Sequence, residues 1–387
     1  MKKKVAILGA TGSIGTSALD ILRLGKDDFE PVLFSSHRNL DGLLALSKEF
    51  PAAALVYSSG EKNFDRENGY LGKKGLLRAI EECGADIVLN GIAGAPGLEP
   101  SLAALKAGAD LALANKETIV MASPLVFALA EKHGSRVIPV DSEHSAIFNL
   151  LEAHGRDKAL ELLLTASGGP FRTWSEKDLK TIGPQEALNH PTWNMGPKIT
   201  IDSATLANKG LEVIEAAFLF EVTPDQIKVI IHPQSVVHSM VRLRDGAVYA
   251  QLSKPDMRFP IHNALYYPEH RSCSIDLLDF DHLVLEFEKP DDKKFPMLPL
   301  AYKAVREGGL YPAVYNAANE VAVNGFLKGK IAFVDIPRIV EYVMNNNWSG
   351  KKLSQADFLS ERALDHILEN DKLARRLAEN YILELNG

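Results

Sequence analysis

The segment Val5-Ala6-Ile7-Leu8-Gly9-Ala10-Thr11-Gly12-Ser13-Ile14-Gly15 decides the fold of the N-terminal part of this chain. Its first residues are apolar and predict a short buried strand, and residues 17–24 that follow have the apolar spacing of a helix. Glycines between strand and helix let the backbone approach a pyrophosphate, and the helix N-terminus offers free N–H groups. The segment therefore predicts a dinucleotide-binding βαβ unit, with GxxGxxG as a variant of the usual GxGxxG.

Short apolar runs and helical segments alternate through the first third of the chain. The further runs that predict strands are 31–34, 85–89, 111–114 and 137–140, and residues 98–106 predict a helix. Fully apolar strands alternating with helices are typical of a parallel sheet covered on both faces. In this context the glycine motif is specific, and a turn that binds nothing is the weaker interpretation.

The end of the second predicted strand indicates which cofactor is bound. It reads Phe34-Ser35-Ser36-His37-Arg38-Asn39. An NAD-specific site places Asp or Glu there, about 20 residues past the glycines, to hold the ribose 2′-hydroxyl. Here Arg38 offers a guanidinium to a 2′-phosphate, with Ser36 or His37 as further donors. This favours NADP(H), and the alternative is that Arg38 is a solvated surface charge.

The rest of the chain divides into an α+β part and a helical part. Strands are expected at 160–165, 228–231, 236–243 and 247–252, the last two as a hairpin, and a long polar loop at 167–197. Helices are expected at 313–326, 336–344, 360–368 and 372–383. We predict an α/β fold with a Rossmann-like NADP-binding domain at 1–141, a central α+β catalytic domain at 142–271, a linker at 272–299 and a C-terminal α-helical bundle at 300–387.

Composition and charge exclude several classes of protein. The chain has 387 residues, a formal net charge of −7 and the composition of a globular protein rather than a disordered one. It lacks an apolar run long enough for a membrane span, and its pI of about 5.9 argues against general nucleic-acid binding. Cys83 and Cys273 cannot form a disulfide framework, so a reducing cytoplasm is the expected compartment. We interpret the N-terminal apolar run as a strand and not as a targeting segment.

Two acidic residues follow the strand expected at 137–140. If that strand continues through Asp141-Ser142-Glu143, both carboxylates point to the same face at its carboxyl end. Two such oxygen ligands suit Mg²⁺ or Mn²⁺. A helix cap explains the same residues, with Ser142 capping a helix that contains 147–151, and without further support the cap is the preferred interpretation.

Support for a metal site comes from the segment 203–212. Asn208 and Glu212 are four residues apart and share a face if the segment is helical, with Lys209 beside them. A third carboxylate beside an amide and an ammonium can complete a metal site next to an anion site. The alternative is an exposed polar helix face with Glu212 and Glu215 in solvent.

Three more segments carry polar residues in unusual places. The turn at 167–172 offers backbone N–H groups for an anion. His190 and Trp193 lie in the long loop, where they predict a lid over a substrate, although Trp193 as an anchor to the core is an equal alternative. Asn316-Ala317-Ala318-Asn319-Glu320 is polar for a bundle helix, and we expect it to cap or cross-brace helices without a catalytic role.

Taken together and in order, six segments resemble the 1-deoxy-D-xylulose 5-phosphate reductoisomerase family over essentially the whole chain. The segments are Gly9–Gly15 (GATGSIG), Asn115–Glu117, Asp141–Glu143, Ser167–Arg172, His190–Trp193 and Asp202–Glu212. This chain has Ala10 where the family often has Ser, and His37-Arg38 where Gly-Lys is common, which keeps the positive charge. Thr192 and Asn194 vary around Trp193.

The resemblance implies a role for each matching residue. The implied metal ligands are Asp141, Glu143 and Glu212, which with Lys116 and His190 make up the catalytic set. The implied phosphate pocket is Ser167, Ser203, Asn208 and Lys209, and further substrate contacts are Lys116, Ser142, Glu143, His190, Trp193 and Glu212. The implied NADPH contacts are Thr11, Gly12, Ser13, Ile14, His37, Arg38, Asn39, Asn115, Glu117 and Gly196, to which the loop motif adds Gly9.

The resemblance also implies the reaction. Family members rearrange 1-deoxy-D-xylulose 5-phosphate and reduce the product with NADPH to 2-C-methyl-D-erythritol 4-phosphate in the non-mevalonate isoprenoid pathway, use Mg²⁺ or Mn²⁺, and form homodimers. The sequence leaves two alternative functions open. One is a different NADP-linked Rossmann dehydrogenase, and the other is an NADP-sensing module without catalysis.

Overall fold

The computed structural model describes residues 1–59, 64, 68–189, 196–273, 275–348 and 361–386. The chain forms two compact units, each assembled from several segments. The first unit consists of Met1–Thr118, Pro124–Ser145 and Asp256–Ile275, and the second of Ile119–Ser123, Ala146–Pro255 and Asp276–Gly387. Among the described residues, no helix is long and apolar enough to cross a membrane.

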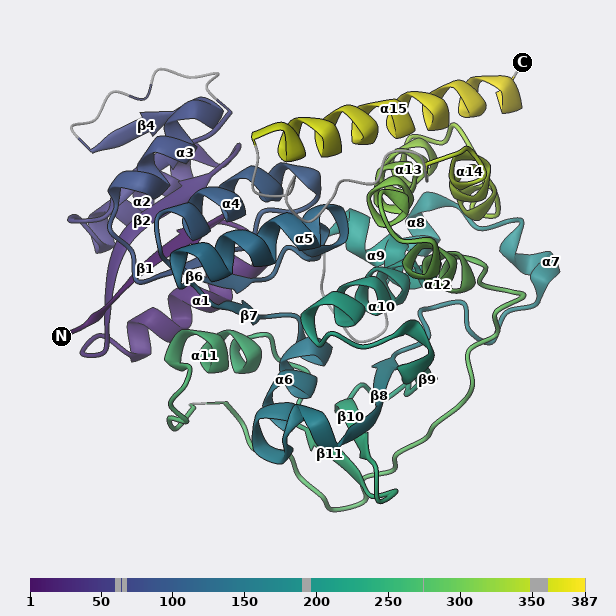
Figure 1. Ribbon diagram of the computed structural model, residues 1–387, viewed down its shortest axis with the longest axis horizontal. Helices are drawn as coiled ribbons and strands as arrows, with labels where there is room; N and C mark the ends of the chain where they lie inside the picture. Colours follow the sequence, from purple (N-terminus) through teal and green to yellow (C-terminus); the bar gives the residue numbers. More distant parts are fainter. Residues whose placement is uncertain (60–63, 65–67, 190–195, 274, 349–360, 387) are drawn as a thin grey trace. The chain divides into compact units, whose positions relative to one another are not determined.

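The first unit is built on a sheet of seven parallel strands in the order β4-β3-β2-β1-β5-β6-β7 (Figure 1). The strands are β1 (Lys3–Leu8), β2 (Phe29–Ser36), β3 (Ala54–Tyr57), β4 (Gly69–Leu71), β5 (Ile87–Asn90), β6 (Asp110–Leu113) and β7 (Val137–Pro139). The strand order reverses between β1 and β5, which is where α/β sheets open a crevice for ligands. The predicted parallel sheet is confirmed, and β3 and β4 are strands that the apolar runs did not reveal.

Helices cover both faces of this sheet. They are α1 (Ser13–Leu24), α2 (Leu40–Glu49), α3 (Gly72–Glu82), the 3-10 turn Ala95–Gly97, α4 (Leu98–Lys106), α5 (Lys116–His133) and α11 (Arg258–Tyr266). Val5 and Ile7 pack in one core with α1, α2 and α11, while the alternate residues Ala6 and Leu8 are equally buried on the opposite face. Burial on both faces explains why β1 is a continuous apolar run.

Helix α11 belongs to this core although it lies inside the segment 142–271, which we predicted to form the α+β domain. Ile261, Ala264 and Leu265 of α11 are fully buried in the first unit's apolar core. Their burial, rather than their place in the chain, decides the assignment of α11. The predicted domain boundaries themselves stay a prediction.

The second unit contains a four-stranded sheet in the order β11-β10-β8-β9. Its strands are β8 (Ala159–Ala166), β9 (Ile227–Ile231), β10 (Val237–Leu243) and β11 (Val248–Leu252). The predicted hairpin is confirmed, because β10 and β11 pair antiparallel around Gly246, whose φ of +91° suits a tight turn. Strands β8 and β9 pair in parallel.

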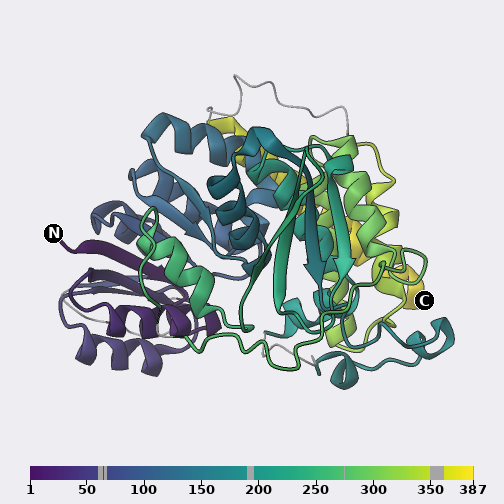
Figure 2. The ribbon, with the colours of Figure 1, turned by 90° about the horizontal axis from the view of Figure 1, so that it is seen from below.

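Helices make up most of the second unit. They are α6 (Ser142–His154, which starts in the first unit), α7 (Glu176–Leu179), α8 (Pro184–Ala187), α9 (Pro197–Ala204), α10 (Ala207–Leu219), α12 (Met297–Glu307), α13 (Tyr311–Leu327), α14 (Asp335–Met344) and α15 (Glu361–Asn386), with 3-10 turns at Arg156–Lys158 and Pro224–Gln226. Figure 2 shows the yellow-green helices α12–α14 on one side of the second sheet. The predicted C-terminal helical bundle is confirmed.

Three expectations for this unit are corrected. The stretch 167–197 is not wholly a loop, because α7 and α8 form within it, each begun by a capping residue or a proline. Helix α12 begins at Met297, inside the segment predicted as a linker. The two helices expected at 360–368 and 372–383 are one continuous helix, α15, because no glycine or proline interrupts its apolar face.

Candidate active site

The glycine-rich loop of the first unit follows β1 and is fastened to the end of β2. The Gly9 N–H donates to Ser35 Oγ across 3.0 Å, and the Ala10 N–H donates to the Ser35 carbonyl across 2.8 Å. The hydroxyls of Thr11 and Ser36 lie 2.8 Å apart. Gly9 has a φ of +78°, which a residue with a side chain adopts only with strain. These hydrogen bonds fix the loop to β2 at the switch point of the sheet.

The loop also forms a cradle at the start of α1. A Cβ atom on Gly15 would overlap the backbone of Gly9 and Ala10, so only glycine lets the helix approach the loop this closely. Gly12 stands at the N-cap position, and no side chain there occupies the first-turn N–H groups. The exposed N-terminus of α1 can therefore accept an anionic group such as a pyrophosphate.

The residues that follow β2 have different roles. Asn39 caps α2, because its Oδ1 accepts the Gly42 N–H across 2.9 Å. His37 Nδ1 lies 3.1 Å from Ser58 Oγ. Arg38 is exposed, and the described part of the chain offers it no ion pair. Its guanidinium is thus available to a ligand phosphate.

The buried side chain of Asn115, just after β6, links the start of α5 to the loop after β5. Its Oδ1 caps α5 by accepting the Thr118 N–H across 2.9 Å, and its Nδ2 donates to the carbonyls of Ile92 and Gly94 and to Glu117 Oε2 across 2.7 to 3.0 Å. The side chain therefore shapes the loop after β5 and orients Glu117. Whether Asn115 and Glu117 also contact NADPH stays a prediction.

A second buried amide in this region was not singled out by sequence reasoning. Asn90 ends β5 and is fully buried; its Nδ2 donates to the Gly97 carbonyl across 2.9 Å and to Ser101 Oγ across 2.7 Å. Its Oδ1 accepts the Ile92 N–H across 3.0 Å. The only signal in the sequence is a polar residue at the end of an apolar strand, just before a glycine-rich turn.

The carboxyl ends of β6 and β7 bring Lys116 and Asp141 together. Lys116 is the first residue of α5, its side chain is 7% exposed, and its Nζ donates to Asp141 Oδ2 across 2.9 Å. Neighbouring parallel strands end at the same edge, so their following residues meet. The expected strand continuation is wrong, because β7 ends at Pro139 and α6 begins at Ser142.

The start of α6 is arranged around Asp141 rather than Ser142. The Glu143 N–H donates to Asp141 Oδ1 across 3.3 Å, and Ser142 Oγ donates to Glu143 Oε2 across 2.6 Å. The Asp141 side chain therefore takes the cap position that the sequence suggested for Ser142. His144, which sequence reasoning missed, is fully buried with its Nδ1 3.6 Å from Asp141 Oδ1.

In the second unit, α10 presents the residues expected to bind metal and phosphate. Asn208 Nδ2 donates to Glu212 Oε1 across 2.6 Å, and Lys209 forms an ion pair with Glu212 Oε2. Lys209, Glu212 and Glu215 are all buried. The alternative of an exposed polar face is wrong, and the shared face of Asn208 and Glu212 is confirmed.

The turn after β8 lies against the end of α9. Gly168 and Gly169 have φ values of +85° and +69°, and a Cβ on Gly169 would lie 2.7 Å from the Ser203 carbonyl oxygen. Leu206 between α9 and α10 has a φ of +59°, a conformation that is strained for a leucine and persists where packing imposes it. The structure therefore brings the turn that carries Ser167 close to Ser203.

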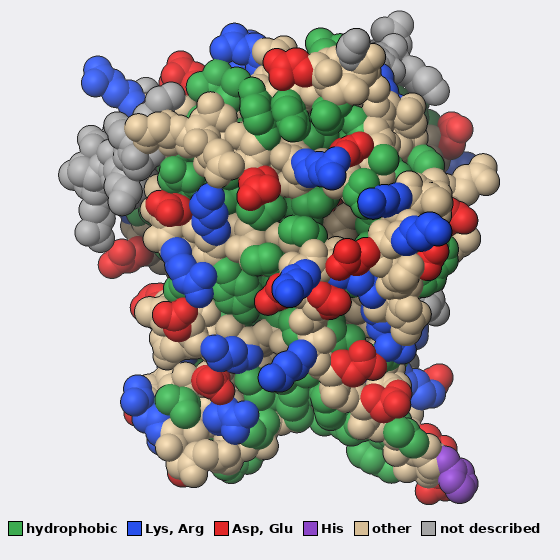
Figure 3. All heavy atoms as spheres, turned by 90° about the vertical axis from the view of Figure 1, so that its right-hand side faces the viewer, with side chains coloured by type: hydrophobic (Ala, Val, Ile, Leu, Met, Phe, Trp, Pro, Cys, Tyr) green, Lys and Arg blue, Asp and Glu red, His purple; other side chains and the backbone are tan. Residues whose placement is uncertain are grey.

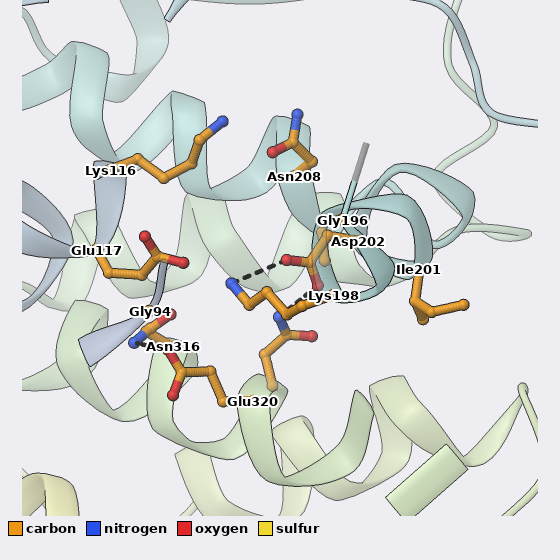
Figure 4. A network of polar contacts seen from close by, with 12 residues as sticks. Gly94, Lys116, Glu117, Gly196, Lys198, Ile201, Asp202, Asn208, Asn316 and Glu320 are labelled. Carbon is orange, nitrogen blue, oxygen red and sulfur yellow. Dashed lines mark hydrogen bonds and ion pairs between the residues drawn. The ribbon is translucent and has the colours of Figure 1, made fainter. Parts of the chain in front are cut away.

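The long loop carries two more residues of the predicted site. His190 and Trp193 lie outside the described residues, so their roles stay predictions. Gly196 is the N-cap of α9 and is exposed. Lys198, two residues later, pairs with Asp202 across 2.9 Å (Figure 4).

Comparison with known proteins decides the family. A family model described as 1-deoxy-D-xylulose 5-phosphate reductoisomerase matches residues 5–123, one described as the C-terminal domain of the same enzyme matches residues 137–220, and one described as the DXP reductoisomerase C-terminal domain matches residues 252–377. The 1-deoxy-D-xylulose 5-phosphate reductoisomerase of Treponema denticola is 46% identical over 388 residues, with 100% of this chain and 99% of that protein covered. This chain belongs to the 1-deoxy-D-xylulose 5-phosphate reductoisomerase family.

Solved structures of this family have the same fold as this chain. A crystal structure of DOX-P reductoisomerase in complex with NADPH, fosmidomycin and magnesium is 40% identical with a TM-score of 0.91, and the match covers 99% of both chains. The Zymomonas mobilis 1-deoxy-D-xylulose 5-phosphate reductoisomerase in complex with NADPH is 38% identical with a TM-score of 0.89, again over 99% of both chains. The α/β fold with its Rossmann-like sheet is therefore that of the reductoisomerase family.

Proposed function

We propose that this protein is an NADPH- and divalent-metal-dependent enzyme that converts 1-deoxy-D-xylulose 5-phosphate to 2-C-methyl-D-erythritol 4-phosphate in non-mevalonate isoprenoid synthesis. The observation that carries the proposal is the 46% identity to the Treponema denticola reductoisomerase over the full length of both chains. The match extends over the whole length of the chain and not over the dinucleotide-binding part alone. A generic dehydrogenase or an NADP sensor would not explain it.

The first unit provides the NADPH site in this proposal. The cradle at the N-terminus of α1 fits the pyrophosphate, since Gly15 leaves no room for a side chain and the first-turn N–H groups are open. Arg38 binds the 2′-phosphate with its free guanidinium. The remaining proposed cofactor contacts of the first unit are Gly9, Thr11, Gly12, Ser13, Ile14, His37, Asn39, Asn115 and Glu117, and Gly196 of the second unit is a further one. When bound, NADPH supplies the hydride for the reduction.

Three carboxylates provide the metal site. The proposed ligands are Asp141, Glu143 and Glu212, because Mg²⁺ and Mn²⁺ prefer carboxylate oxygens. Buried Glu212 is oriented by Asn208 and Lys209, and Asp141 by Lys116, so these oxygens are placed before an ion arrives. When bound, the ion supplies Lewis-acid polarisation of the substrate's oxygens.

The second unit provides the phosphate pocket. Ser167 on its glycine turn, Ser203 at the end of α9, and Asn208 and Lys209 on α10 supply hydroxyl, amide and ammonium donors. The phosphate is remote from the reacting carbons, so its binding energy serves to orient the substrate. This local set of donors explains how a chain of net charge −7 binds an anionic substrate.

Lys116 and Ser142 contact the substrate near the reacting carbons in this proposal. The Lys116 ammonium is buried and held by Asp141, so it can donate a hydrogen bond to an oxygen on which negative charge develops. Ser142 is buried at the first turn of α6, with its hydroxyl on Glu143. His190 and Trp193 complete the substrate contacts from the long loop.

We further propose a homodimer that forms through exposed apolar residues of the second unit. Leu277, Phe280, Val284 and Phe287 in the segment after Asp276 are all more than 45% exposed, and Val248 and Tyr249 are exposed on the edge strand β11. Figure 3 shows apolar side chains interspersed with charged ones on one face of the molecule. Exposed apolar residues and exposed edge strands are both typical of association surfaces. A reducing cytoplasm fits the free thiols of Cys83 and Cys273.

The test is NADPH oxidation followed by absorbance with 1-deoxy-D-xylulose 5-phosphate as substrate. Turnover is expected with Mg²⁺ or Mn²⁺ and none after the metal is chelated, because the carboxylates alone cannot polarise the substrate. NADPH binding without turnover in the presence of either metal would overturn the assignment in favour of a sensor. Light scattering after gel filtration tests the dimer, and a mass of about 42.4 kDa would contradict it.

A further inference from the structure

Helix α13 places two asparagines in the interior of the helical bundle. Asn316 and Asn319 are fully buried beside Val314, Ala317 and Ala318, whose side chains are apolar. A buried amide destabilises a bundle unless it is hydrogen-bonded, so apolar residues would serve packing better. These two positions therefore require an explanation beyond packing.

Asn319 binds a buried carboxylate on α9. Its Nδ2 donates to Asp202 Oδ1 across 2.8 Å, and Asp202 is fully buried. Lys198 Nζ approaches Oδ2 of the same carboxylate, as Figure 4 shows. A donor on α13 binds one oxygen of the carboxylate and a donor on α9 binds the other, so the carboxylate is held in one orientation. The expected cross-brace is confirmed, and it joins α13 to α9.

Helix α13 is itself firmly anchored. Glu320 directly follows Asn319, and its Oε2 accepts a hydrogen bond from Arg375 Nη2 across 2.7 Å. Arg375 Nε in turn donates to Asp371 Oδ2 across 2.7 Å. Both Arg375 and Asp371 belong to α15. Tyr315, one turn earlier on α13, donates its hydroxyl to the Met297 carbonyl across 3.1 Å. The helix that carries Asn319 is therefore hydrogen-bonded to both α15 and α12.

Helix α9 carries part of the proposed phosphate pocket. Ser203 directly follows Asp202, so the contact made by Asn319 acts one residue away from a phosphate donor. The turn at 167–169 lies against the same point, because a Cβ on Gly169 would be 2.7 Å from the Ser203 carbonyl oxygen. A small shift of α9 would therefore change the spacing between Ser203 and Ser167.

We propose that Asn319 is a positioning residue for the substrate's phosphate. It acts through Asp202, holds the end of α9 against the turn at 167–169, and so keeps Ser203 and Ser167 at the spacing that a phosphate group requires. The inference rests on the proposed function, since it takes this pocket as the phosphate site.

The first test compares Asn319→Ala with Asn316→Ala, a matched control on the same helix with the same residue type and burial. Asn319→Ala is expected to raise the KM for 1-deoxy-D-xylulose 5-phosphate and the Kd for inorganic phosphate about tenfold, as for loss of a hydrogen bond to a charged group. The KM for NADPH should change by less than about twofold, because the cofactor cradle is built from other elements. Equal effects of the two variants on phosphate affinity would overturn the proposal.

The second test is a double-mutant cycle with Asp202→Ala, which removes the oxygen that accepts the Asn319 hydrogen bond. Because both substitutions break one contact, the double variant should raise the KM about as much as the larger single variant. Additive effects would show that Asn319 does not act through Asp202. If Asn319→Ala fails to fold, Asn319→Ser, which leaves a polar group in the space, takes its place, and an unchanged phosphate Kd in that variant would contradict the proposal.

The two proposals fail in different ways. If the wild-type enzyme does not turn over 1-deoxy-D-xylulose 5-phosphate, the proposed function is wrong whatever the variants do. If the wild type turns over and binds inorganic phosphate while Asn319→Ala retains both constants, only the positioning role is wrong.

Discussion

The buried ammonium of Lys116 donates to the carboxylate of Asp141 across 2.9 Å. The two residues follow the neighbouring parallel strands β6 and β7, and each stands at the beginning of a helix. The pair places a positive charge and a proposed metal ligand at one point of the sheet edge. Truncating either partner would remove one side of a largely buried ion pair, which is typically destabilising.

Lys116→Gln is expected to lower kcat by at least about 100-fold, because it removes the charged donor that we propose contacts the substrate near the reacting carbons. NADPH affinity should stay within about threefold of the wild type, since the glycine cradle is untouched. Stopped-flow turnover and NADPH fluorescence titration measure the two quantities. A variant that keeps full kcat would exclude Lys116 from the catalytic set.

Glu212→Gln keeps the shape of a buried side chain but removes its charge. The expected result is a loss of Mg²⁺ affinity and of kcat by about 100-fold or more, as for removal of a metal ligand, while NADPH still binds. Activity titrated against Mg²⁺ or Mn²⁺ measures the first effect. Glu215→Gln is the matched control, because Glu215 is equally buried on the same helix. Parallel loss of NADPH binding in Glu212→Gln would refute the separation of the two sites.

Arg38→Ala should raise the KM for NADPH about 10- to 100-fold and leave the KM for NADH nearly unchanged, because only NADPH carries the 2′-phosphate. Arg38 is exposed, so the melting temperature should not change. The control is Arg78→Ala, an exposed arginine of the same unit that pairs with Glu82. An unchanged ratio of the two KM values in Arg38→Ala would show that another group reads the 2′-phosphate.

His262 makes the stability of the first unit depend on pH. Burial lowers the pKa of His262 below its usual 6.5, despite hydrogen bonds to the Ser272 backbone and the Asn263 side chain that oppose the shift. The unfolded chain therefore takes up the proton first as the pH falls, and the stabilisation present above pH 6.5 is lost as the pH falls from there through the lowered pKa.

The expected result is a smaller loss of unfolding free energy between about pH 7.5 and about pH 5.5 in His262→Gln than in the wild type. Urea denaturation at the two pH values measures it. His270→Gln is the control, because His270 is an exposed histidine of the same unit. Identical slopes in the wild type and His262→Gln would contradict the assignment of this pH dependence to His262.

Local sequence patterns predicted those features that depend on contacts between residues close together in the chain. The apolar run at Val5–Leu8 and the glycines after it predicted β1, the cradle and α1, because burial on both faces and close backbone approach both leave a local residue pattern. The four-residue spacing of Asn208 and Glu212 likewise predicted their contact on α10. Helices α2 and α3, whose apolar positions are mixed with polar ones, were not predicted.

Contacts between residues far apart in the sequence could not be predicted from local patterns. Asp141 and Ser142 are equally good helix caps by residue type, and only the end of β7 at Pro139 decides that the Asp141 side chain takes the cap. Asn90 and Asn319 stand out only as polar residues in apolar segments, and such a residue identifies a contact only once its partner in the fold is known.

The sequence by itself determined that the chain begins with a dinucleotide-binding βαβ unit, that Arg38 replaces the acidic residue of NAD sites, and which family the ordered motifs resemble. These conclusions depend on residue type and short spacing, which the chain carries locally. The tertiary structure decided that Lys116 meets Asp141, that Glu212 and Glu215 are buried rather than solvated, and that Asn319 braces Asp202 across 117 positions. Burial and long-range hydrogen bonds depend on how elements pack, and packing is a property of the folded chain as a whole.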